Sequence, residues 1–232
     1  MTTTGEGLIV RGLEVCYGKN SVLRGLDLTV EPGQVVGLVG RNGAGKTTTL
    51  RAISGVTSRR GGSVTFKGQP LSHRPSVVAR AGLSHVPEGR GLIGSLTAEE
   101  NLRVAAYGAG RTLDAETLTW VSRIFPRMER VLARRADILS GGEQQMVALA
   151  RALVADATMV MIDELSLGLA PIVVEEAWQA LRELRDSKGV SLLVVDQNLG
   201  LIEKYADSIY LLKNGVTHAW EDYDSTEMAL VY

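Results

Sequence analysis

Apolar and polar residues alternate near the start of the chain and later give way to short, wholly apolar runs. The segments LIVRGLEVCYG and SVLRGLDLTV alternate, which predicts two strands with one covered face each. The run Val35–Gly40 is apolar throughout, and so are Met159–Ile162 and Leu192–Val195. Runs of this kind are typical of strands that are covered on both faces, as in a parallel sheet.

Helical patterns lie between these strands and become dense in the middle of the chain. A helix is predicted over Lys46–Ser54, where Gly55 is placed to end it. A second is predicted around 173–187. From about residue 88 to 153 the pattern is mainly helical, with Thr97 and Glu100 at the spacing of a capping box and helical periodicity up to Pro126.

Two hairpins complete the predicted fold. GGSVTFKGQP turns at Lys67-Gly68, and SIYLLKNGVTHAW turns at Asn214-Gly215. Strands that alternate with helices indicate an α/β protein with a mainly parallel core sheet, an antiparallel β part and a helical insertion. We expect one domain over residues 1–232, with a core formed by 1–88 and 152–232 and a helical subdomain formed by 89–151.

The composition is that of a globular protein without a strongly basic surface. Of 232 residues, 45% are hydrophobic and 22% charged, and the formal net charge is −1. No apolar stretch approaches the roughly 20 residues of a membrane-spanning helix, and MTTTGEGLIV lacks the features of a signal peptide. Any membrane role is therefore expected to come through a partner.

The single cysteine, Cys16, suits a reducing compartment and is expected to be a half-buried strand residue rather than a reactive thiol. His73, His85 and His218 share no metal-ligand spacing.

The segment GRNGAGKT, Gly40–Thr47, fits the G-x-x-x-x-G-K-[ST] pattern of a phosphate-binding loop. Its glycines let backbone N–H groups approach phosphates, and the following helix adds a favourable dipole. Lys46 is expected to reach the β- and γ-phosphates, and the Thr47 hydroxyl to ligate Mg²⁺. A glycine-rich turn that binds nothing is the alternative, but a buried strand precedes the loop and a helix follows it. The residues expected to bind ATP are Tyr17, Gly40, Arg41, Asn42, Gly43, Ala44, Gly45, Lys46, Thr47 and Thr48.

The segment MVMIDE supplies a second element of the same chemistry. An apolar strand carries Asp163 to its end, where a carboxylate can hold Mg²⁺ through water. Glu164 is placed to orient or deprotonate an attacking water. Two solvated acids at a strand end are the alternative interpretation. Together with the phosphate loop, this element predicts a nucleoside triphosphatase.

The segment ILSGGEQQMVALARAL decides which class of triphosphatase the chain resembles. Ser140 and Glu143 form a capping box at the start of a helix, and little side chain blocks an anion at its N-terminus. The segment resembles the signature LSGGQ of the ABC ATPases, which appears here as Leu139-Ser140-Gly141-Gly142-Glu143. The resemblance covers essentially the whole chain. It implies that the signature of one subunit meets the γ-phosphate held by a second ATPase subunit, in a head-to-tail homo- or heterodimer around two ATPs.

The resemblance implies roles for residues outside these motifs. Tyr17 stands where the family has an aromatic that stacks on adenine, although a lone tyrosine is more often a surface residue. The segment SLGLAP resembles the loop that contacts the opposing subunit. Glu88, in VPEGR, stands where the family usually has a Gln that touches Mg²⁺ and senses the membrane partner. Gln197, in VVDQN, stands where most members have a His on the γ-phosphate. The expected catalytic residues are Glu164, Gln197 and Lys46, and the expected metal ligands are Thr47, Asp163 and Glu88.

The combination of PEGR, DE-x-SLGLAP and V-[DE]-QN is similar to one of the two ATPase subunits of branched-chain amino acid importers. Such importers also contain two membrane permeases and a periplasmic or extracellular substrate-binding protein. The resemblance places the chain on the cytoplasmic face of the membrane, held there by a permease. Leu165 departs from the Pro that usually follows the catalytic Glu, and the ending EDYDSTEMALVY is short and unlike the family's.

Other members of the family remain as alternatives. A urea or short-chain amide importer is the first, and lipid or lipopolysaccharide export follows. A soluble ABC ATPase acting on DNA or ribosomes usually carries long insertions. This chain is one compact unit without a basic patch, and no nucleic-acid partner is expected.

Overall fold

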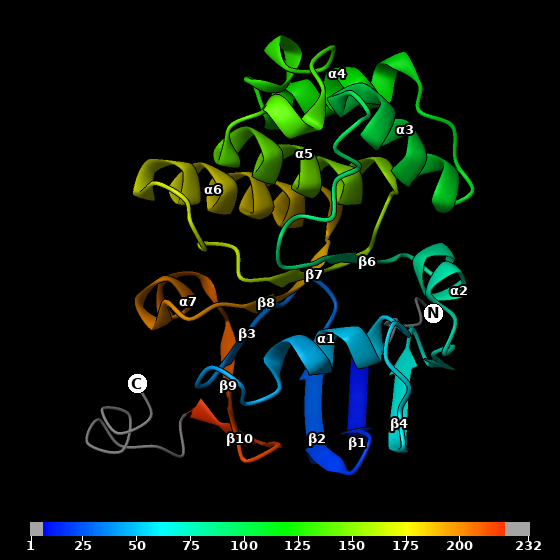
Figure 1. Ribbon diagram of the computed structural model, residues 1–232, viewed down its shortest axis with the longest axis vertical. Helices are drawn as coiled ribbons and strands as arrows, with labels where there is room; N and C mark the ends of the chain where they lie inside the picture. The colour runs from blue at the N-terminus through cyan, green and yellow to red at the C-terminus, as the bar shows by residue number, and fades with distance from the viewer. Residues whose placement is uncertain (1–6, 221–232) are drawn as a thin grey trace.

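A computed structural model of the chain describes residues 7–220, so the ending EDYDSTEMALVY lies outside the described residues. Two sheets and the helices around them form three layers (Figure 1). The four-stranded sheet is antiparallel and has the order β2 (Asn20–Val30), β1 (Leu8–Tyr17), β4 (Gly61–Phe66) and β5 (Gln69–Pro70). The six-stranded sheet has the order β10 (Val216–Ala219), β9 (Ser208–Lys213), β3 (Val35–Val39), β8 (Ser191–Val195), β7 (Met159–Asp163) and β6 (Leu83–Val86).

All strands of the six-stranded sheet run parallel except β10, which turns back on β9. Both predicted hairpins are present, because β5 follows β4 after the turn at Lys67-Gly68 and β10 follows β9 after Asn214-Gly215. The mainly parallel core with antiparallel strands attached is therefore confirmed.

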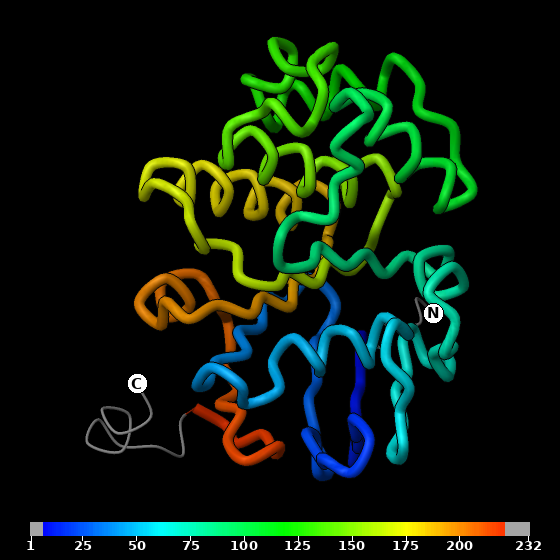
Figure 2. The backbone as a smooth tube through the Cα atoms, viewed as in Figure 1, coloured from blue at the N-terminus to red at the C-terminus, as the bar shows by residue number. Residues whose placement is uncertain are grey.

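The helices lie on both sides of the six-stranded sheet (Figures 1 and 2). They are α1 (Lys46–Ile53), α2 (Pro75–Arg80), α3 (Ala98–Gly108), α4 (Ala115–Ile124), α5 (Gly141–Val154), α6 (Pro171–Lys188) and α7 (Leu199–Tyr205), with short 3₁₀ turns η1 (Met128–Arg130) and η2 (Ala136–Ile138). None of the helices in this part of the chain has the length and apolar character needed to cross a membrane.

Alternate residues of the central strands enter two separate cores. Val160 of β7 and Val194 of β8 pack with helices α3–α7, whereas Met161 and Val195 pack with α1 and the antiparallel sheet. Successive side chains of a strand point to opposite faces, so an apolar residue is needed at every position. This explains why the predicted runs are unbroken. Gly37 of β3 is the exception, because a Cβ there would lie 2.2 Å from Cγ2 of Ile202 in α7.

The sequence pattern did not predict three short elements, and helix α4 ends earlier than predicted. β6, α2 and α7 were not predicted, since each is only 4–7 residues long and short runs carry little periodicity. The helical pattern predicted up to Pro126 stops at Ile124. Phe125 is not helical, at φ −122° and ψ 82°, because the residue before a proline avoids the helical conformation.

Candidate functional site

Four loops meet at the carboxyl edge of the parallel sheet. They follow β3, β6, β7 and β8, and side chains from all four line a hollow of about 530 Å³. In open α/β sheets ligands bind outside the carboxyl ends of the strands. The residues lining the hollow are Val22, Asn42, Gly43, Gly45, Lys46, Thr47, Thr48, Glu88, Glu164, Leu167 and Gln197.

The loop between β3 and α1 has the shape that its sequence predicts. Gly45 has φ 111°, where a residue with a side chain is strained, and a Cβ on it would lie 2.9 Å from Cδ2 of Leu23 and would displace that side chain. The Nζ atom of Lys46 lies inside the loop and donates to the carbonyl oxygens of Gly40 at 2.7 Å and Arg41 at 3.3 Å. Burial lowers the pKa of Lys46, while the nearby carboxylates of Glu164 and Asp163 act in the opposite direction. The amine is thus held where it can turn from carbonyl oxygens to phosphate oxygens.

Asp163 and Thr47 form a pair that fits a divalent cation. The Thr47 hydroxyl donates to Oδ1 of Asp163 at 3.2 Å, and Oδ2 of Asp163 is buried without a hydrogen-bond partner among the described residues. Burial raises the pKa of Asp163, and the charges of Glu164 and Glu88 add to the effect. Within residues 7–220 no group of three His, Cys, Asp or Glu side chains gathers to hold a metal. Mg²⁺ needs few protein ligands when phosphates and waters supply the rest, so this donor set fits Mg²⁺.

Glu164 and Gln197 are in direct contact. Nε2 of Gln197 donates to Oε1 of Glu164 at 2.6 Å. Glu164 has φ 55°, a conformation that costs free energy for a residue with a side chain. Its backbone N–H donates to the carbonyl oxygen of Val195 at 2.8 Å. The structure therefore brings together the expected base and the glutamine that replaces histidine.

Asp196 was not among the predicted site residues, yet it organises two of the loops. Its Oδ1 accepts hydrogen bonds from the Ser166 hydroxyl at 2.7 Å and from Asn198 N–H at 2.8 Å, and its Oδ2 accepts one from Ser166 N–H at 2.8 Å. The side chain is 1% exposed. Three polar residues directly after a buried strand were the feature of the sequence that could have revealed this role.

Leu165, which replaces the usual Pro, is fully buried in the core that packs against the helices. Burial of this apolar side chain holds the backbone between Glu164 and Ser166 against the core.

Glu88 and Tyr17 have different neighbours around the phosphate loop. Glu88 is at the exposed start of the loop after β6 and lines the hollow with Glu164 and Thr47. Tyr17, at the end of β1, is 46% exposed, and its hydroxyl lies 3.3 Å from Oγ1 of Thr57. That contact lowers the pKa of Tyr17, and a hydrogen bond with Thr48 contributes. The tyrosine thus lies beside the start of α1 with its ring accessible.

The predicted signature lies elsewhere. Ser140 caps α5, and the capping box with Glu143 is present. Glu143 also forms an ion pair with Arg134 at 3.0 Å. None of residues 139–143 is among the described residues that line the hollow around the phosphate loop. One chain therefore presents its phosphate loop and its signature at separate places.

Comparison with known proteins agrees with this arrangement. The family model described as "ABC transporter" matches residues 23–166. The chain belongs to the ABC transporter family. It is the ATP-binding, ATP-hydrolysing subunit of such a transporter, and its fold is that of an ABC cassette.

The relatives and solved structures cover most of the cassette. The chain is 38% identical over 200 residues to the "High-affinity branched-chain amino acid transport ATP-binding protein BraG" of Pseudomonas aeruginosa, covering 86% of this chain and 85% of BraG. It is 32% identical over 204 residues to the "Probable branched-chain amino acid transport ATP-binding protein LivF" of Archaeoglobus fulgidus, covering 88% and 86%. A solved ATP-binding subunit of an ABC transporter superposes with a TM-score of 0.82 at 31% identity, covering 97% of this chain and 94% of that one.

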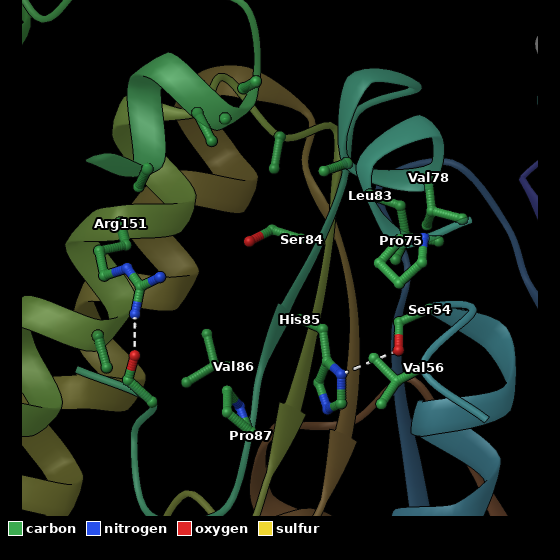
Figure 3. A pocket seen from close by; sticks show the side chains of 18 of the residues that line it. Ser54, Val56, Pro75, Val78, Leu83, Ser84, His85, Val86, Pro87 and Arg151 are labelled. Carbon is green, nitrogen blue, oxygen red and sulfur yellow. Dashed lines mark hydrogen bonds between the residues drawn. The ribbon is translucent and has the colours of Figure 1, made fainter. Parts of the chain in front are cut away.

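A second hollow, the β6 groove, lies between the core and the helical part of the cassette. Its volume is about 660 Å³, and β6, α1, α2, α3 and α5 contribute to its walls. In Figure 3 His85 and Val86 of β6 lie in the middle, with Arg151 of α5 on one side of them and Ser54 and Val56, which follow α1, on the other. Nδ1 of His85 lies 3.1 Å from the Ser54 hydroxyl, and Nε2 is buried without a partner in the part of the chain that is described.

The environment of His85 predicts a pH-dependent stability. Burial, with a contribution from Arg51, lowers the pKa of His85 from 6.5 to about 4. The unfolded chain therefore binds this proton at a higher pH than the folded cassette does. Above the unfolded pKa, His85 leaves the free energy of unfolding unchanged. As the pH falls from about 6.5 to about 4, His85 lowers the free energy of unfolding by up to about 3 kcal/mol. In urea unfolding, His85→Leu should lose this part of the acid destabilisation.

Ser54→Ala is the matched control, because it removes the partner of the ring and leaves the titrating ring in place. It should keep the acid destabilisation of the unchanged protein. If His85→Leu and the unchanged protein showed the same change of unfolding free energy between pH 7 and 4, the buried neutral histidine would be contradicted.

Proposed function

We propose that this cassette energises the import of branched-chain amino acids. The observation that carries the proposal is the 38% identity to BraG over 86% of the chain. The residues that distinguish the subgroup support it, because Glu88 and Gln197 both line the hollow around the phosphate loop.

ATP is bound by the phosphate loop, with its adenine on Tyr17 and its phosphates on the backbone N–H groups of residues 40–48. Lys46 turns from the carbonyl oxygens of Gly40 and Arg41 to the β- and γ-phosphates. Thr47 and Asp163, with Glu88 beside them, would hold Mg²⁺, which would neutralise charge on the phosphates. Glu164 orients the attacking water in line with the γ-phosphate, and Gln197 holds the carboxylate of Glu164 by its amide.

ABC cassettes dimerise and join permease subunits in transporter complexes. In the dimer proposed here, residues 139–143 of one subunit cover the γ-phosphate bound by the other, because one chain holds its signature apart from its own phosphate loop. At the N-terminus of α5 Ser140 is exposed and Gly141 and Gly142 carry no side chain, which suits contact with an anion. The second subunit is a further ABC ATPase, either another copy or a related chain.

The β6 groove is the proposed contact with the permease. Its walls are mainly apolar, and Val56, one of the apolar residues that line it, is 61% exposed. Exposed apolar patches of this kind mark interaction sites. Docking of a permease there places the cassette on the cytoplasmic face of the membrane, in a complex that also contains a substrate-binding protein. Closure of the dimer then moves α3–α5, and through the groove it moves the permease.

Replacement of the proposed base should separate binding from hydrolysis. Glu164→Gln keeps the shape of the side chain but cannot accept a proton, so we expect turnover to fall by at least about 10²-fold while ATP binding is retained. ATPase assays and size-exclusion chromatography with ATP measure this, and the variant should accumulate as a closed dimer. Hydrolysis at the rate of the unchanged protein would remove Glu164 from the role of base.

Replacement of Gln197 tests why a glutamine stands beside the phosphate. A neutral amide donates a hydrogen bond but carries no charge, so the site that uses Gln197 is proposed to be the slower of the two in the transporter. A charged donor gives about 1 kcal/mol more, so Gln197→His should raise turnover about fivefold. Gln197→Ala, which loses the donor, should lower it. Unchanged turnover of Gln197→His, both in the isolated chain and in the assembled transporter, would contradict the proposal.

The transported molecule is tested in cells that lack the gene. Uptake of labelled leucine should be lost in these cells. It should return when the intact gene is supplied, but not when the Glu164→Gln variant is supplied. In a separate experiment, permeases and a binding protein should purify with the tagged chain. Loss of urea or short-chain amide uptake, with leucine uptake intact, would instead support the second candidate.

A further inference from the structure

Arg90 connects the loop after β6 to the first turn of the signature helix α5. Its Nη1 donates to Oε1 of Gln144 at 2.8 Å. The guanidinium group also lies against Gly141, since a Cβ on that residue would be 3.2 Å from Nη2 of Arg90. A residue two positions after Glu88 is thus in contact with the helix that begins after Ser140.

Gln144 is held from two sides. Its Oε1 accepts from Arg90, and its Nε2 donates to the carbonyl oxygen of Ala136 in η2 at 2.8 Å. η2 lies directly before the signature in the chain, and Gln144 directly follows the signature within α5. The path from Arg90 through Gln144 to Ala136 therefore joins both flanks of the signature to the loop after β6.

The loop after β6 is a tight turn that is fixed to α5. Gly89, Arg90 and Gly91 have φ values of 75°, 70° and 61°, and a left-handed conformation at a residue with a side chain persists only where its surroundings enforce it. The Arg90 N–H donates to the carbonyl oxygen of Pro87 at 2.9 Å. Arg151, in the last turn of α5, donates to the carbonyl oxygen of Gly91. The tight turn is thus bound to α5 at two points.

The other end of this loop is in the nucleotide site. Glu88, Gly89 and Arg90 line one small hollow together with Gln145, Asp163 and Glu164. A shift of Glu88 toward bound Mg²⁺ and nucleotide therefore displaces a stiff turn that carries Arg90.

We propose that Arg90 is a positioning residue, which acts through Gln144 to couple the nucleotide site of one chain to the signature that the same chain offers to its partner. The proposal rests on the head-to-tail dimer of the proposed function. It predicts that Arg90 and Gln144 affect ATP-driven closure of the dimer and leave the binding of ATP to one subunit unchanged.

The test compares Arg90→Ala, Gln144→Ala and the double variant in the Glu164→Gln protein, alone and with any ATPase subunit that purifies with it. Dimer formation is followed by analytical ultracentrifugation against ATP concentration, and binding to the monomer by a fluorescent ATP analogue. A hydrogen bond from a charged group is worth roughly tenfold in an equilibrium constant. We therefore expect about a tenfold higher ATP concentration for half-maximal dimerisation, with monomer affinity unchanged. Arg90→Ala and Gln144→Ala both remove the bond between these two side chains, so the double variant should be no worse than the more affected single variant.

Two further variants separate positioning from general damage. Arg90→Lys keeps the charge but not the planar fork, so it should give an intermediate shift. Arg111→Ala breaks an ion pair with Asp156, 2.6 Å long, at the opposite end of α5, and should not shift dimerisation. Thermal unfolding of each variant checks that it is folded.

The proposal is overturned if Arg90→Ala and Gln144→Ala dimerise at the ATP concentration of the parent, if their effects add, or if Arg111→Ala produces the same shift. A Glu164→Gln protein that fails to dimerise with ATP in either preparation contradicts the proposed dimer, and the coupling with it. If the Glu164→Gln parent dimerises with ATP and the variants dimerise at the same ATP concentration, the coupling alone is contradicted.

Discussion

The pairing of β7 with β8 is the constraint on which the nucleotide site depends. Asp163 lies beside Val195 in the register of these parallel strands, and the next backbone N–H, that of Glu164, donates to the carbonyl oxygen of Val195. Because the side-chain period of a strand is two residues, a shift of one position would turn Asp163 away from Thr47 and Glu164 away from Gln197. The buried apolar residues on both faces of the strands prevent such a shift.

Asp196 extends this constraint from the strands to the loops. Its three hydrogen bonds join Ser166, after the proposed base, to Asn198, after Gln197. A buried carboxylate is costly unless such bonds compensate it, so the two loops stabilise each other's conformation. The short contact between Glu164 and Gln197 follows from this arrangement. A base that must orient water needs a fixed carboxylate, and these two loops fix the carboxylate of Glu164, the proposed base.

The phosphate loop and the signature lie at separate places within one chain. The loop after β6 contacts both of these regions, with Glu88 at the nucleotide site and Arg90 at α5. The β6 groove opens on the same loop, since Pro87, Arg90 and Gly91 line it (Figure 3). The nucleotide site, the signature helix and the groove thus all contact one short segment.

The sequence by itself determined the phosphate loop, the unbroken apolar strands, both hairpins and the capping boxes at Thr97 and Ser140, because each depends on residues close together in the chain. Helical periodicity likewise located α3 to α6. The tertiary structure alone decided the contacts between loops: Gln197 on Glu164, Asp196 on Ser166, and Arg90 on Gln144. These pairs are 30 or more residues apart, and no local pattern encodes them. They exist because parallel strands bring their carboxyl ends to one edge, where loops from distant parts of the chain must satisfy one another's polar groups.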